Sequence, residues 1–109
     1  MAHDLDRVFK ALADGHRRRL LDRLRARPGQ TLQELCAGLP MSRQAVAKHL
    51  ALLARAHLVV KVRHGREQWH YLNPVPLHAV CERWIGKFEI PHLQALSALK
   101  RRLEDRPHE

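Results

Sequence analysis

"MSRQAVAKHLALL", residues 41–53, is the stretch that decides the fold. Ser42 has a side chain that can cap the N-terminus of a helix. Val46, Leu50 and Leu53 follow at intervals of four and three residues, which places them in one stripe along a helix. The pattern predicts a helix from Ser42 to about Ala56 with this stripe packed in a core.

The opposite face of this helix carries residue types that suit the major groove of DNA. The groove admits one α-helix, and Arg, Lys and Gln pair well with the base edges that it exposes. A small Ala allows close approach, and a Ser at the helix N-terminus can hold a phosphate. The alternative is an exposed helix face that is merely solvated. We predict DNA contacts from Ser42, Arg43, Gln44, Ala47, Lys48 and His49.

The segment before this helix, "TLQELCAGLP" at residues 31–40, predicts a short helix of about two turns. Thr31 and Glu34 have the spacing of a capping box, and Gly38 with Pro40 ends the helix. Two helices separated by so few residues predict a helix-turn-helix over about residues 31–56.

The segment after it, "LVVKVRHGREQWHYLN" at residues 58–73, changes to a strand pattern rich in β-branched and aromatic residues. His64, Gly65 and Arg66 supply a turn in its middle, so we predict a β-hairpin, or wing, over about 58–72. Arg63, His64 and Arg66 lie at or beside the tip, where a wing meets a DNA backbone or minor groove. Glu67 is the nearest carboxylate.

The remaining segments predict further helices. Apolar residues at helical spacing favour a helix over 5–12, and Asp14 can cap a second helix that carries Leu20, Leu21 and Leu24. Asn73 and Pro74 open C-terminal helices over about 74–104. The expected fold is mainly α with a small β-hairpin: a winged helix-turn-helix in which residues 1–109 form a single domain.

Composition favours a polyanionic partner. The 109 residues include 20 Lys and Arg against 11 Asp and Glu, a net charge of +9. No apolar run of about twenty residues predicts a membrane span, and an acidic N-terminus without an apolar core argues against secretion. Two cysteines without paired spacing argue against a disulfide scaffold and fit a reducing cytoplasm. Together with DNA binding, this predicts a cytoplasmic, nucleoid-associated protein.

Two other classes of protein are alternatives to a specific DNA-binding regulator. An enzyme is not favoured, because the sequence has no Gly-rich phosphate loop, paired carboxylates or nucleophile elbow. A basic interaction module would instead bind any polyanion, with no preference for sequence. A specific regulator would bind one operator far more tightly than random DNA.

Taken together, these pieces resemble the ArsR/SmtB family of bacterial winged-helix repressors. "FKALADGHRRRLLDRL" is similar to the family's entry signature, "TLQELCAGLPMSRQAVAKHLALLARAHLV" to its helix-turn-helix, and "VRHGREQWHYLN" to its wing. The resemblance implies a homodimer, assembled through the first and last helices, that binds a palindromic operator in double-stranded DNA and blocks transcription. Asp14-Gly15-His16 departs from the family pattern, in which a Pro commonly opens the second helix.

The dimer interface is expected on apolar residues of the terminal helices. The stripe from Leu77 to Leu103 is long for a chain of this size, so part of it needs a partner surface. The residues assigned to this interface are Leu5, Val8, Phe9, Leu77, Trp84, Ile85, Phe88, Leu93 and Leu96.

No sensor site for a metal or other cofactor is predicted. Relatives use a Cys-x-Cys pair, but here Gly38 stands at the second thiolate position after Cys36, and Ile90 stands where another arrangement has an acid. Cys36 and Cys81 lie on apolar stripes, which favours two small buried side chains. A thiol-based redox repressor that uses both cysteines remains the alternative, and the sequence names no effector.

Overall fold

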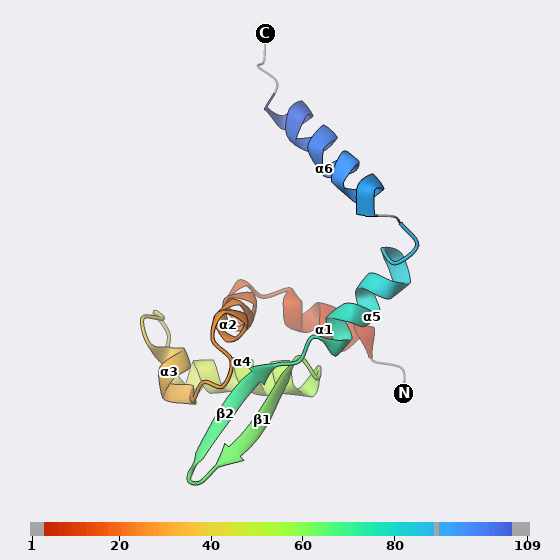
Figure 1. The fold of residues 1–109 in the computed structure, drawn as a ribbon. Coiled ribbons are helices and arrows are strands. Elements are labelled where there is room, and N and C mark those ends of the chain that lie inside the picture. The colour runs from red at the N-terminus through yellow and green to blue at the C-terminus, as the bar shows by residue number, and fades with distance from the viewer. Residues whose placement is uncertain (1–3, 89, 106–109) are drawn as a thin grey trace. The chain divides into compact units, whose positions relative to one another are not determined.

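The structure, a computed structural model, describes residues 4–88 and 90–105. Its contacts divide the chain into two compact units, of which the first ends at Ala79 and the second begins at Val80. The helix-turn-helix and the hairpin lie wholly in the first unit (Figure 1).

In the described residues four helices precede one hairpin and two helices follow it, the order that the sequence predicts, which confirms a winged helix-turn-helix fold. The elements are α1 Leu5–Leu12, α2 Gly15–Ala26, α3 Leu32–Cys36, α4 Arg43–Arg55, β1 Val59–His64, β2 Glu67–Leu72, α5 Val75–Trp84 and α6 Ile90–Glu104. Pro91 lies in the first turn of α6, where a missing N–H costs no hydrogen bond.

The predicted caps Asp14 and Ser42 begin α2 and α4. The Asp14 carboxylate accepts hydrogen bonds from the backbone N–H of His16, at 2.7 Å, and of Arg17, at 3.4 Å. The Ser42 hydroxyl oxygen accepts from the N–H of Ala45 at 3.1 Å. Asp14 thus starts α2 without the Pro that is common at this point of the family's signature.

The core of the first unit lies among α1 to α4 and the start of β1. On α4, Val46, Leu50 and Leu53 have exposed fractions of 0%, 2% and 0%, so the predicted stripe is confirmed as core. Leu20 and Leu24 of α2 and Leu35 of α3 are fully buried in the same cluster. Because this face of α4 is used in packing, its opposite face is turned outward.

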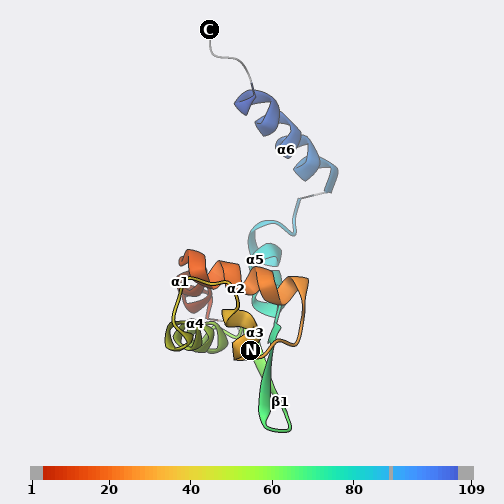
Figure 2. The same cartoon turned by 90° about the vertical axis from the view of Figure 1, so that its left-hand side faces the viewer.

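The wing is a two-stranded antiparallel hairpin whose register runs from Val59 opposite Leu72 to His64 opposite Glu67. It projects away from the helices of the first unit in both views (Figures 1 and 2). Gly65 adopts a φ of +64° at its turn, a conformation that favours glycine. An isolated bridge between Gln30 and His70 joins the hairpin to the segment between α2 and α3.

The second unit carries exposed apolar side chains. On α6, Leu96, Leu99 and Leu103 have exposed fractions of 58%, 52% and 60%. No helix in the described part of the chain combines the length and apolar character needed to cross a membrane.

Candidate nucleic-acid interface

The outward face of α4 presents most of the side chains predicted to contact DNA. Arg43, Gln44 and Lys48 are exposed, and Ala47 between them is partly buried. Ser42 is exposed at the N-cap of the same helix. The face that remains after Val46, Leu50 and Leu53 pack is therefore cationic and rich in hydrogen-bond donors.

The side chain of His49, another predicted DNA contact, meets residues of α2. Its side chain is half-buried, and its Nδ1 atom lies 3.3 Å from Nη1 of Arg17, a residue of α2. Its ring centroid is 5.8 Å from that of His16. An Arg guanidinium can only donate, so Nδ1 of His49 is the acceptor in this contact. The structure thus places His49 at a junction between α4 and α2.

The N-terminal half of α4 and the wing enclose a groove of about 620 Å³, here called the helix–wing groove. It brings together Arg43 and Ala47 of α4 with Arg66 of the wing, three of the predicted contact residues. Its full lining is Thr31, Leu32, Gln33, Arg43, Ala47, Leu50, Lys61, Arg66, Glu67, Gln68 and His70. Three of these side chains are cationic at neutral pH, and Glu67 is the one carboxylate among them.

The sequence reasoning missed Lys61, Gln68 and Gln33 as members of this surface. The strand register explains the first two. Lys61 pairs with His70 and Gln68 pairs with Arg63, so these four side chains occupy one face of the hairpin. Alternation along β2 places Gln68 on the same face as His70, but the burial of His70 and its pairing with Lys61 are features of the structure. Gln33 depends on how α3 packs, which periodicity alone does not specify.

Contacts within the wing hold its tip. The His64 ring stacks on Trp69 with centroids 4.0 Å apart, and Nε of Arg63 donates to the Gly65 carbonyl at 3.1 Å. His64 and Arg63 thus stabilise the turn that presents Arg66, and neither lines the helix–wing groove.

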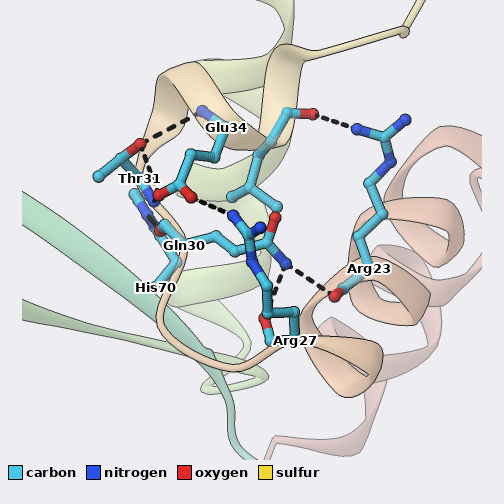
Figure 3. Close-up of polar contacts among 7 residues, drawn as sticks. Arg23, Arg27, Gln30, Thr31, Glu34 and His70 are labelled. Atoms are coloured by element: carbon cyan, nitrogen blue, oxygen red, sulfur yellow. Dashed lines mark hydrogen bonds and ion pairs between the residues drawn. The ribbon is translucent and has the colours of Figure 1, made fainter.

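A polar junction ties the wing to α2 (Figure 3). The amide Nε2 of Gln30 donates to the carbonyls of Arg23 and Arg27, at 2.8 and 2.7 Å, at the end of α2. The Gln30 carbonyl accepts from the His70 backbone N–H and from its ring Nδ1, both at 2.8 Å. The side chain and the backbone of Gln30 therefore connect α2 to β2 directly.

Burial affects the ionisation of His70. The residue is 4% exposed, and desolvation lowers the pKa of its imidazole below the usual 6.5. The hydrogen bond to the Gln30 carbonyl acts in the opposite direction, and the charge of Lys61 lowers the pKa further.

A second set of contacts orients α3, the first helix of the helix-turn-helix (Figure 3). Thr31 and Glu34 form the predicted capping box, in which the Glu34 N–H donates to the Thr31 hydroxyl at 3.2 Å. The reciprocal bond from the Thr31 backbone N–H holds the pKa of the Glu34 carboxyl below its usual value, and Arg27 forms an ion pair with it. Nη1 of Arg23 donates to the carbonyl of Ala37 at 2.6 Å and so caps the C-terminus of α3.

The two cysteines are free and differ in environment. Cys36 is half-buried and packs against the core, in line with a small buried side chain. Cys81 is exposed, which corrects the expectation that both would be buried. Among the described residues, no three His, Cys, Asp or Glu side chains are grouped to hold a metal ion.

The residues expected at a dimer interface fall into three groups. Val8 is fully buried in the core of the first unit, so its side chain has no surface to offer a partner. Leu5, Leu77 and Leu93 are half-buried. The remaining members have exposed fractions between 42% and 58% and are Phe9, Trp84, Ile85, Phe88 and Leu96.

These features together define a winged helix-turn-helix DNA-binding domain: a capped, core-packed recognition helix beside a basic wing. Comparison with known proteins agrees. Residues 12–63 match the family model of a helix-turn-helix domain. The uncharacterized HTH-type transcriptional regulator YuzN of Bacillus subtilis is 41% identical over 86 residues, which cover 73% of this chain and 94% of that protein.

Two further relatives identify the family to which the chain belongs. The HTH-type transcriptional regulator Rv2034 of Mycobacterium tuberculosis is 41% identical over 75 residues, or 69% of each chain. An ArsR-like transcriptional regulator from Rhodococcus sp. RHA1 superimposes with a TM-score of 0.68 at 34% identity, over 94% of this chain and 93% of that one. The chain belongs to the ArsR family of DNA-binding transcriptional regulators.

Proposed function

We propose that this regulator is a repressor that binds an inverted-repeat operator as a homodimer. The observation that carries this proposal is the helix–wing groove, where cationic and amide side chains of α4 and of the hairpin face one shared space. Such a groove can hold one edge of the DNA backbone while α4 enters the major groove beside it.

The two elements have different tasks in this proposal. Arg43, Gln44 and Lys48 project from the outward face of α4 and read base edges, and Ala47 lets the helix approach closely. The Ser42 hydroxyl already accepts the capping bond, so its own proton is available to donate to a phosphate. Arg66 and Lys61 of the wing neutralise phosphates without regard to sequence.

The exposed leucines of α6 support a homodimer. Leu96, Leu99 and Leu103 recur at helical spacing and form one apolar stripe. A stripe of this kind is typical of an association surface. We infer that residues 1–109 act as one subunit, with residues 31–56 and 58–72 reading DNA and residues 74–104 pairing two copies. A two-fold dimer presents two recognition helices to the two halves of a palindrome.

The test is selection of bound sequences from random DNA, followed by salt titration on the selected site. We expect an inverted repeat to be enriched and bound about a thousandfold or more tighter than random DNA. Enrichment of no sequence, with uniform salt-sensitive binding to all DNA, would instead identify a general polyanion-binding module.

Two substitutions separate the roles of helix and wing. Gln44→Ala should relax the preference at one base position, with a loss of about 1–3 kcal/mol on the selected site. Arg66→Ala should weaken binding to all DNA alike and lower the salt slope by about one. Arg25→Ala, an exposed position on α2, removes the same charge elsewhere and is the matched control. Identical behaviour of Gln44→Ala and Arg66→Ala would refute this division of labour.

A further inference from the structure

We propose that a second groove, between α1 and the C-terminal half of α4, binds a small organic anion with an apolar body, such as an aliphatic carboxylate. We also propose that this binding weakens the affinity for DNA, a step that rests on the proposed function.

The groove, here called the α1–α4 groove, has a volume of about 560 Å³. That volume is within the range of small-molecule sites, about 300–1,000 Å³. It is lined by Arg7, Lys10, Ala11, Arg17, Leu52, Arg55 and Ala56, all in the first unit.

The charge of this lining calls for an anion. Four of the seven lining residues are cationic and none is acidic. Arg7 and Arg17 have local carboxylate partners: Nε of Arg7 lies 3.3 Å from Asp4, and Nη1 of Arg17 lies 3.8 Å from Asp14. Within the described part of the chain, Lys10 and Arg55 have no such partner. An anion between these two side chains would relieve the mutual repulsion of the cations and form charge-assisted hydrogen bonds.

The remaining lining calls for an apolar body. Ala11 and Ala56 are 4% exposed and form a small-residue wall, and Leu52 keeps 43% of its surface exposed beside them. A phosphate or chloride ion would leave this surface in water. A short aliphatic chain would cover it and gain the free energy of apolar burial.

The α1–α4 groove occupies a different side of α1 from the expected dimer residues. Arg7, Lys10 and Ala11 are spaced three and four residues apart and share one face of the helix. Leu5 and Phe9 are four residues apart and share another face, about half a turn away. Pairing of two copies through Leu5 and Phe9 therefore leaves this groove to a separate ligand.

Two residues that line the groove, Arg17 and Arg55, connect it to the recognition helix α4. Nε and Nη2 of Arg17 donate to the carbonyls of Ala11 and Lys10, at 2.8 and 3.0 Å, and its Nη1 meets Nδ1 of His49 on α4 at 3.3 Å. Arg55 is seven residues beyond Lys48 and lies along the same side of α4. An anion held at Arg55 removes positive charge beside the DNA-reading face, so DNA affinity should fall.

The first experiment uses the full chain without DNA and sodium octanoate as the probe. The backbone amide NMR signals of residues that line the α1–α4 groove should shift during the titration. The dissociation constant that the titration gives should be about tenfold or more higher in the Lys10→Gln/Arg55→Gln variant. Both side chains are exposed, so the variant should fold normally. Arg19→Gln/Arg25→Gln, two exposed positions on α2, lowers the net charge equally and should leave the titration unchanged.

Three outcomes would overturn this assignment. One is an octanoate titration that leaves these resonances in place. Another is inorganic phosphate binding as tightly as octanoate, which would identify a simple phosphate site that a DNA backbone could also fill. A third is octan-1-ol, which lacks the charge, binding as tightly as octanoate.

The second experiment measures DNA affinity with and without saturating octanoate. We expect octanoate to lower the DNA affinity of the native chain and to leave that of Lys10→Gln/Arg55→Gln unchanged. By linkage, DNA should raise the dissociation constant of octanoate by the same factor. Unchanged DNA affinity in the native chain would refute the coupling and leave the binding site standing. Failure of all DNA binding in the absence of octanoate would refute the proposed function instead.

Discussion

Helices α4 and α6 carry similar apolar stripes and use them differently. On α4, Val46, Leu50 and Leu53 are at most 2% exposed, whereas on α6 Leu96, Leu99 and Leu103 are at least 52% exposed. Both patterns have helical spacing and both segments are helices. The spacing thus predicts which residues share a face, but it does not predict which surface that face packs against.

The surroundings of the two helices explain the difference. α4 packs against α1, α2, α3 and β1. The elements around it are held in turn by the junction at Gln30 and His70 and by the contacts of Arg23 with the end of α3. In the proposed homodimer, a second copy of the chain covers the exposed stripe on α6. Changes to the α4 stripe should therefore act on folding, and changes to the α6 stripe on self-association.

The largest expected effect is on α4. Leu50→Ala removes a side chain that is 2% exposed and should lower the free energy of unfolding by about 2–5 kcal/mol, through lost burial and the cavity left behind. Urea unfolding followed by circular dichroism measures this. A loss below about 1 kcal/mol would show that the core around α4 collapses to fill the space.

The next effect is on α6. Leu99→Asp places a charge in the exposed stripe and should raise the dissociation constant of a dimer by roughly a hundredfold, because the charge would be buried without a partner. Sedimentation equilibrium measures the constant. Gln94→Asp adds the same charge on the opposite side of α6 and should change it little. Equal effects of the two substitutions would show that the leucine stripe is not part of the dimer interface.

A smaller effect distinguishes the start of α4 from the middle of α6. Ser42→Ala removes the oxygen that accepts from the Ala45 N–H and should cost about 1 kcal/mol of unfolding free energy. Ser97→Ala, at an exposed position within α6, should be neutral or slightly stabilising, because Ala has the higher helix propensity. Thermal unfolding of the two variants gives the comparison, and equal losses would mean that the cap does not stabilise α4.

The smallest effect is expected from pH. The pKa of His70 is lowered in the folded chain, so below about 6.5 the unfolded chain binds more protons. Stability from this group is therefore complete above pH 6.5 and declines as the pH falls toward the lowered pKa. Urea unfolding between pH 7.5 and about 5 should show a shallower decline in His70→Gln than in the native chain. His92→Gln, at an exposed position, is the control and should retain the native slope.

The contrast between α4 and α6 also shows how much of the fold and of the DNA-binding surface could be predicted from the sequence. Local signals were sufficient for the caps at Asp14, Thr31 and Ser42, because a cap depends on side chains within three residues of the amide that they accept from. The hairpin followed from strand-forming residues on both sides of His64-Gly65-Arg66, where Gly65 adopts a positive φ in the structure. His49 could not be placed in this way, because its partner Arg17 lies 32 residues away in sequence.

The sequence by itself determined that α4 is an amphipathic helix with a cationic outward face, since spacing and residue type are properties of the segment alone. Only the tertiary structure decided that Lys61 and Gln68 join Arg43 in the helix–wing groove, because this depends on strand register and on how the hairpin meets α3 and α4. It also decided that Lys10 and Arg55, 45 residues apart in the sequence, line one groove. Contacts between distant segments arise from the packing of whole elements, which no local pattern encodes.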